Sequence, residues 1–102
     1  MVLLGVPGSD VVIELYVISG VEKHPASARP CDPANGHICF YVADLDALYA
    51  RLVACGHESG AGRVIALPPG SAAGADGKVV YMVYPDGFHV ELYERPPAVS
   101  AD

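Results

Sequence analysis

Two copies of one tetrad limit the folds that this chain of 102 residues can adopt. Residues 13–16 (IELY) and 90–93 (VELY) differ by one conservative change, and each copy follows a turn with proline, at Pro7 or at Pro85. Matching tetrads at matching places favour duplication of a structural unit. The second copy has a predicted strand, helix and strand ahead of its hairpin. About 35 residues of an equivalent first unit would then be missing at the front, through truncation or a misplaced start.

Turn residues divide the chain into short segments with strand composition. The predicted strands, each rich in β-branched, aliphatic or aromatic residues, are residues 2–6, 11–17, 37–42, 63–67, 78–84 and 88–94. The first two form a predicted hairpin around residues 7–10 (PGSD), and the last two form another around residues 85–87 (PDG).

One segment, residues 44–55, has helical periodicity. Asp44 can cap its N-terminus, and Gly56 suits the left-handed conformation that follows many helices. The apolar side chains on one face of this helix are Leu45, Leu48, Tyr49, Leu52 and Val53. This face predicts packing on a sheet.

Together these elements predict an α+β protein. We expect a βαβββ unit plus an N-terminal β-hairpin, in a curved mixed sheet with one main helix packed on it. Residues 1–18 would be the closing hairpin of an incomplete first unit, and residues 19–35 a linker with several prolines and glycines. Residues 36–94 would be the complete unit, and residues 95–102 a disordered tail.

Composition excludes several classes of function. Twelve acidic residues against six basic ones give a formal charge of −6, which argues against nucleic acid as a partner. No apolar run is long enough to span a bilayer, so no membrane association is expected. Three cysteines without CxxC spacing indicate reduced thiols and a cytoplasmic location.

Strand alternation separates three ionisable side chains from the apolar residues of their strands. Glu14, His37 and Glu91 each lie opposite the apolar face of a predicted strand. Carboxylates and imidazoles are costly to bury unless they are paired, protonated or coordinated. Such donors suit Zn, Ni, Co, Mn or Fe(II). On the same faces lie Cys39, His89, Tyr16, Tyr41 and Tyr93.

Each candidate also has an ordinary structural interpretation. A strand glutamate is most often solvated, although the repeated tetrad makes a ligand role for Glu14 and Glu91 equally plausible. His37 would otherwise be a structural hydrogen-bonding residue, and His89 a residue at the rim of the sheet. The tyrosines more often line a wall than react.

Three segments of the chain resemble the second half of vicinal oxygen chelate proteins. They are residues 36–42 (GHICFYV), 44–48 (DLDAL) and 84–93 (YPDGFHVELY), and residues 4–15 resemble the closing hairpin of the first half. This superfamily includes glyoxalase I, methylmalonyl-CoA epimerase, extradiol dioxygenases, and fosfomycin and bleomycin resistance proteins. The resemblance implies paired βαβββ modules that form a curved sheet around a divalent metal.

The resemblance also implies roles for particular residues. Glu14 matches the last-strand metal ligand of the first module, and His37 and Glu91 match the first- and last-strand ligands of the second. The first-strand ligand of the first module, usually histidine, has no counterpart. A glutamate at the position of Glu14 is typical of glyoxalase-like and epimerase-like members.

The implied function is that of a metal-dependent lyase or isomerase. It would abstract a proton next to a carbonyl of a small substrate with vicinal oxygens, with Glu14 or Glu91 as the base. The alternatives are a non-catalytic small-molecule-binding protein of the bleomycin-resistance type, a dioxygenase-like member, or a degenerate remnant that merely folds. Because an incomplete module exposes a strand edge and an apolar face, we expect a homodimer.

Overall fold

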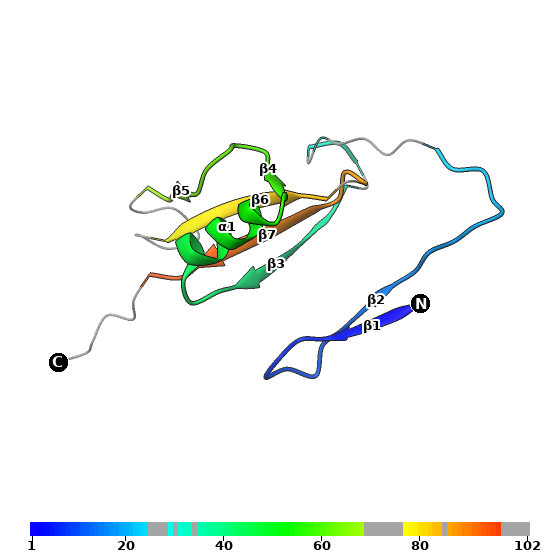
Figure 1. Ribbon diagram of the computed structural model, residues 1–102, viewed down its shortest axis with the longest axis horizontal. Helices are drawn as coiled ribbons and strands as arrows, with labels where there is room; N and C mark the ends of the chain where they lie inside the picture. Colours follow the sequence, from blue (N-terminus) through cyan, green and yellow to red (C-terminus); the bar gives the residue numbers. More distant parts are fainter. Residues whose placement is uncertain (25–28, 30, 34, 69–76, 85, 97–102) are drawn as a thin grey trace.

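A mixed sheet with one helix on it forms the main body of this α+β protein (Figure 1). The computed structural model describes residues 1–24, 29, 31–33, 35–68, 77–84 and 86–96. The sheet has five strands: β3 (His37–Tyr41), β4 (Glu58–Ser59), β5 (Ile65–Ala66), β6 (Lys78–Val83) and β7 (His89–Glu94). Its order is β3-β7-β6-β4, and β5 also pairs with β6. β3 runs parallel to β7, and the other pairs are antiparallel.

The helix α1 (Leu45–Ala54) forms where the sequence predicts it. The Asp44 carboxylate accepts a hydrogen bond of 3.1 Å from the Ala47 amide, which caps the first turn. Gly56 has a φ of +87°, and this left-handed conformation ends the helix. The Leu45 amide donates to Glu94 Oε1 at 3.1 Å, so the start of the helix is fixed to the end of β7.

One face of the sheet packs against α1 and forms the core. The buried side chains of this core are Leu45, Val80, Met82, Val90 and Leu92, with Phe40, Val42, Leu48, Tyr49, Leu52 and Val64 partly buried around them. This confirms that the apolar sides of the strands face the helix. Among the helices of the described residues, none is long and apolar enough to cross a membrane.

Between α1 and β6 the structure differs from the expected single strand at residues 63–67. Two strands of two residues each, β4 and β5, pair with β6 instead. The chain leaves β6 between them, since Gly62 has a φ of +70° and turns the backbone away. The loop that follows β5 is described only to residue 68, and the rest, through residue 76, lies outside the described residues.

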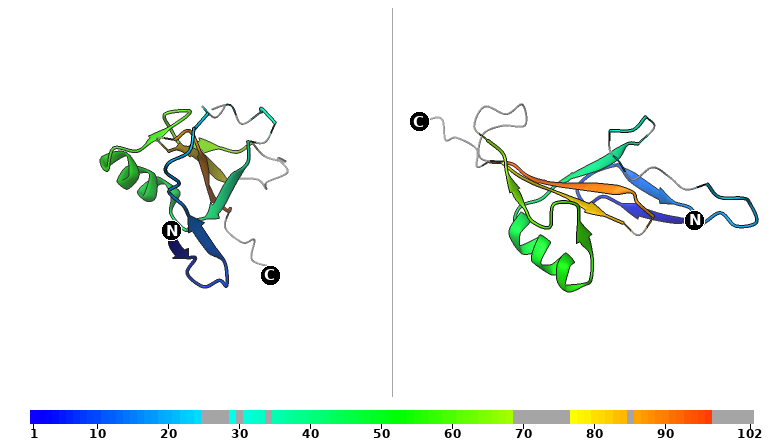
Figure 2. Two further views of the ribbon diagram at one scale, coloured as in Figure 1. Left: turned by 90° about the vertical axis from the view of Figure 1, so that its right-hand side faces the viewer. Right: turned by 90° about the horizontal axis from the view of Figure 1, so that it is seen from above.

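The N-terminal hairpin is separate from this body. Strands β1 (Val2–Gly5) and β2 (Val12–Leu15) form their own antiparallel sheet, which confirms the predicted hairpin. It lies outside the five-stranded sheet, on the side of β3, while α1 covers one face (Figures 1 and 2). The described residues between β2 and β3 form no helix or strand, and residues 97–102 of the expected tail are not among those described.

The assigned core predicts that alanine substitution of two valines changes the free energy of unfolding by different amounts. Val80 is 1% exposed in β6, and Val53 is 47% exposed on α1. Val80→Ala leaves a cavity beneath the helix and should lower the free energy of unfolding by about 2 kcal/mol. Val53→Ala removes the same atoms at an exposed helical position and should change it by less than about 0.5 kcal/mol. Urea unfolding followed by circular dichroism measures both; equal losses would contradict the assigned core.

Candidate functional site

The sheet face opposite α1 carries most of the polar side chains of the long strands. Register places Cys39 of β3 beside Glu91 of β7, and Tyr81 of β6 on the other side of Glu91. Because side chains alternate along a strand, one face collects every second residue. We call this the open face, and its residues are His37, Cys39, Tyr41, Val79, Tyr81, Val83, His89, Glu91 and Tyr93.

The centre of the open face is a contact between His37 and Glu91. His37 Nε2 lies 2.8 Å from Glu91 Oε2, so the imidazole N–H donates to the carboxylate. The two residues are 54 positions apart in the chain and come from β3 and β7. Their side chains are 37% and 20% exposed, which leaves the pair open to a small molecule from solvent. The His37 ring also meets the Tyr81 ring edge-on, with 5.2 Å between centroids.

Glu91 influences two further neighbours on the open face. Burial raises the pKa of the Cys39 thiol, and the negative charge of Glu91 and a hydrogen bond to it raise that pKa further. The pKa of the Tyr81 hydroxyl is also raised, mainly by burial. The negative charge of Glu91 and a hydrogen bond to Glu91 raise it further. Cys39 and Tyr81 therefore stay protonated near neutral pH. A thiol held protonated is a poor nucleophile, which argues against covalent catalysis by Cys39.

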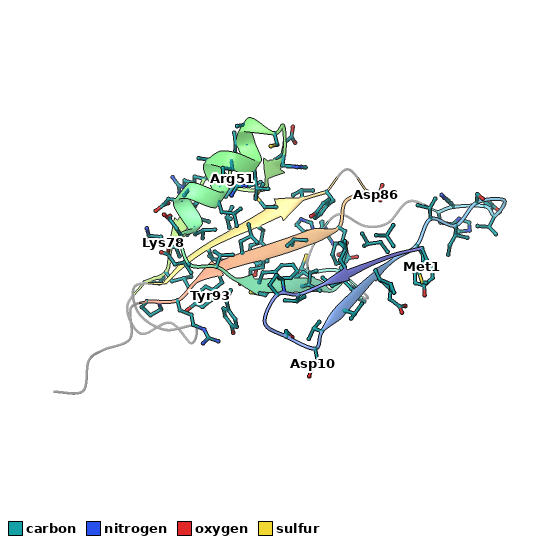
Figure 3. All side chains as sticks on the ribbon, turned by 60° about the horizontal axis from the view of Figure 1, so that its bottom comes forward. Met1, Asp10, Arg51, Lys78, Asp86 and Tyr93 are labelled. Carbon is teal, nitrogen blue, oxygen red and sulfur yellow. The ribbon has the colours of Figure 1, made fainter. Side chains whose placement is uncertain are left out.

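The structure does not bring Glu14 to this pair. Glu14 lies on β2, exposed, and its carboxylate accepts a hydrogen bond of 2.7 Å from the Tyr16 hydroxyl. This bond raises the pKa of Tyr16. Met1 and Asp10 mark the hairpin in Figure 3, and its two strands form a sheet of their own, distinct from the sheet that contains Tyr93. Within the described residues, no three histidine, cysteine, aspartate or glutamate side chains form a group able to hold a metal ion.

The other histidine of the open face, His89, is half-buried at the start of β7 and lies in register with His37. Sequence reasoning missed Tyr81, whose ring contacts His37 and whose pKa is raised by Glu91. The register of the second hairpin could have identified this residue. A hairpin with its turn at residues 85–87 pairs Tyr81 with Glu91. The position of that turn in the sequence was therefore enough to predict this pair.

A concavity lies on the helix side of the sheet, away from His37 and Glu91. It has a volume of about 180 Å³, and its lining is Phe40, Leu48, Leu52, His57, Met82, Val83, Tyr84, Val90 and Leu92. The His57 and Tyr84 rings in this lining lie 6.5 Å apart between centroids. The lining is almost wholly apolar, so this cavity offers shape and hydrophobic contact rather than acid–base chemistry.

Comparisons with known proteins add no relative. The chain matches no family model, no curated protein and no solved structure. The site must therefore be judged on its own geometry.

The raised pKa of Cys39 predicts slow alkylation. At pH 8 iodoacetamide should modify Cys39 more slowly than the exposed Cys55, because the thiolate fraction of Cys39 is smaller. In Glu91→Gln the negative charge is lost, and the rate at Cys39 should rise while the rate at Cys55 stays the same. Peptide mass spectrometry follows both sites at once. An unchanged rate at Cys39 in the variant would show that Glu91 does not act on the thiol.

Proposed function

We propose that this chain is a glyoxalase- or epimerase-type enzyme of the vicinal oxygen chelate superfamily. In this proposal it removes a proton next to the carbonyl of a small molecule bound on the open face. The observation that carries the proposal is the 2.8 Å contact between His37 and Glu91, from the first and last strands of the residue 36–94 unit. The order of elements along the chain, from β3 through α1 and the short strands to β6 and β7, supports it because it fits the βαβββ order that the resemblance implies.

Glu91 is the base in this proposal. A carboxylate has about four lone-pair sites, and the hydrogen bonds from His37, Cys39 and Tyr81 use up to three, so one site remains for a substrate proton. The proton moves from carbon to a Glu91 oxygen, and the electron pair of the C–H bond moves into the adjacent carbonyl to form an enolate or enediolate. The Tyr81 hydroxyl stays protonated and hydrogen-bonds to Glu91, so in this proposal it helps to hold the carboxylate in position.

A divalent ion, one of Zn, Ni, Co, Mn or Fe, is part of the proposal. When bound, such an ion stabilises the negative charge that develops on the substrate oxygens. The nitrogen of His37 and the oxygen of Glu91 are suitable donors, but within the described part of one chain they are only two. The third proposed ligand, Glu14, would have to come from the hairpin of a second copy.

The exposed hairpin supports a homodimer. Large apolar side chains project into solvent along its whole length: Val2, Leu3, Leu4, Val11, Val12, Leu15, Tyr16, Val17 and Ile18 are all at least 46% exposed. An isolated two-stranded hairpin is marginally stable in water, and natural proteins cover apolar patches of this kind. In the described part of the main sheet, β3 pairs with β7 alone and so leaves one edge open. We propose that the hairpin of each copy covers the β3 side of the other.

Three free cysteines fit a reducing compartment, and a cytoplasmic location belongs to the same proposal.

The dimer predicts that one charge on the hairpin separates the copies. Leu4 and Val53 are similarly exposed, at 46% and 47%, but only Leu4 lies on the hairpin. Leu4→Glu should shift the wild-type dimer to monomer, because a carboxylate would be desolvated in the interface. Val53→Glu should leave the dimer intact. Sedimentation velocity distinguishes the species, and a monodisperse wild-type monomer would contradict the proposed dimer.

Mixing two inactive chains tests the shared metal site. Glu14→Ala and His37→Ala should each abolish stoichiometric binding of Zn or Ni. Co-refolded in equal amounts, they form mixed dimers in which one of two sites has Glu14 and His37 intact. About a quarter of wild-type metal binding should therefore return by symmetry. Glu22→Ala, in the exposed segment after the hairpin, is the control and should bind metal fully.

The outcomes of this experiment separate the function classes. Recovery of metal in the mixed dimers supports the enzyme, and solvent deuterium should then enter thiol–aldehyde adducts or acyl thioesters next to the carbonyl. Absence of metal in the wild type under every loading condition contradicts the metal-dependent enzyme. That result would favour the small-molecule-binding alternative, for which the apolar cavity of about 180 Å³ is the supporting observation.

A further inference from the structure

Beyond Glu91, the open face ends in a cation held over the Tyr41 ring, which in turn meets the Tyr93 ring. The guanidinium carbon of Arg95 lies 3.8 Å from the centroid of the Tyr41 ring. The Tyr41 and Tyr93 rings meet edge to face, with 5.6 Å between centroids, and the two residues are partners in the β3–β7 ladder. This contact holds the guanidinium against the Tyr41 ring and leaves N–H groups available to an anion.

The platform under Arg95 is packed. Tyr93 is 7% exposed, and its ring lies against the backbone of the buried Gly77. A Cβ at Gly77 would come within 2.9 Å of the Tyr93 hydroxyl oxygen, so this position admits the ring only because it is glycine. The fold therefore fixes the Tyr93 ring, and Tyr93 in turn supports the more exposed Tyr41 ring that Arg95 covers.

The charge of Arg95 is available for a ligand. Arg29 pairs with Asp32, and Lys78 pairs with Asp46 and Glu94. Among the described residues Arg95 forms no ion pair, although the chain carries twelve acidic side chains. The neighbouring Glu94 points to the helix side, where it accepts from the Leu45 amide and lies 3.7 Å from Lys78. Within the described part of the chain, no carboxylate at this end of the strand therefore neutralises Arg95.

Strand geometry sets the distance between Arg95 and the base. Arg95 follows Glu91 by four residues, which is about 13 Å along an extended chain. The long arginine side chain can shorten this span. A ligand with its carbonyl at Glu91 would thus extend its far end along Tyr93 toward Arg95.

We infer that Arg95, on its Tyr41–Tyr93 platform, binds a carboxylate or phosphate at the far end of the substrate. The substrate is then a small carbonyl compound that carries an anionic group several bonds from its reacting carbon. This inference rests on the proposed function for the identity of the ligand as substrate, but anion binding by Arg95 can be measured without turnover.

The experiment is an NMR titration of the full chain with succinate and, separately, inorganic phosphate, with succinamide as the uncharged control. The Arg95 Nε–H and the Tyr41 and Tyr93 ring signals should shift with saturation for at least one anion and not for succinamide. Arg95→Gln should weaken that binding by about tenfold or more, since a charge-assisted bidentate contact is lost. Arg95→Lys should weaken it less, because a charge remains without the planar fork.

Two further variants keep this test separate from the proposed function. Arg51→Gln removes an exposed arginine from α1 and should leave anion binding unchanged. Glu91→Gln should abolish deuterium exchange but retain anion binding at Arg95. Equal anion affinity in wild type and Arg95→Gln overturns the inference even if metal binding and exchange are found. Anion binding lost only in Arg95 variants upholds it even if the mixed-dimer experiment fails.

Discussion

The parallel pairing of β3 with β7 is the contact on which both the core and the candidate site depend. It joins strands that flank the whole residue 36–94 unit, and each residue of β3 has a defined partner in β7. On the helix side this register places Phe40 beside Leu92 in the core. On the other side it brings His37 within 2.8 Å of Glu91. A slip of one residue would exchange these faces, so burial of the apolar residues fixes the geometry of the polar ones.

Local rules predicted much of this arrangement from the sequence. Asp44 and Gly56 mark the two ends of α1 because capping and left-handed backbone are local chemistry. Period-two alternation assigned the open and buried faces of β3 and β7 correctly. The repeated tetrad identified Glu91, and the structure gives that residue three polar neighbours.

What the sequence left undetermined depends on contacts between distant segments. Nothing local distinguishes one strand at residues 63–67 from the short pair β4 and β5, because their hydrogen bonds are decided by β6. The position of Glu14 likewise depends on where the hairpin packs, which the sequence does not specify. Its tetrad matches that of Glu91, yet the hairpin forms its own sheet and Glu14 bonds to Tyr16 instead. A repeat in sequence predicts equivalent strands, but tertiary contacts decide whether their side chains converge.

The two faces of the sheet differ in composition: one forms the apolar core, and the other carries the ionisable side chains. The helix side uses its apolar residues for stability, and its cavity has almost no polar lining. The open face keeps most of its ionisable groups partly exposed around one carboxylate. Burial and Glu91 raise the pKa of both Cys39 and Tyr81, so these groups remain neutral donors and the negative charge stays on Glu91. With Arg95 at the other end of the same row, the face has a carboxylate at its centre and a cation at its rim. A ligand with a polarised carbonyl and a distant anionic group would be held in one orientation, because reversing it would place like charges together at Glu91.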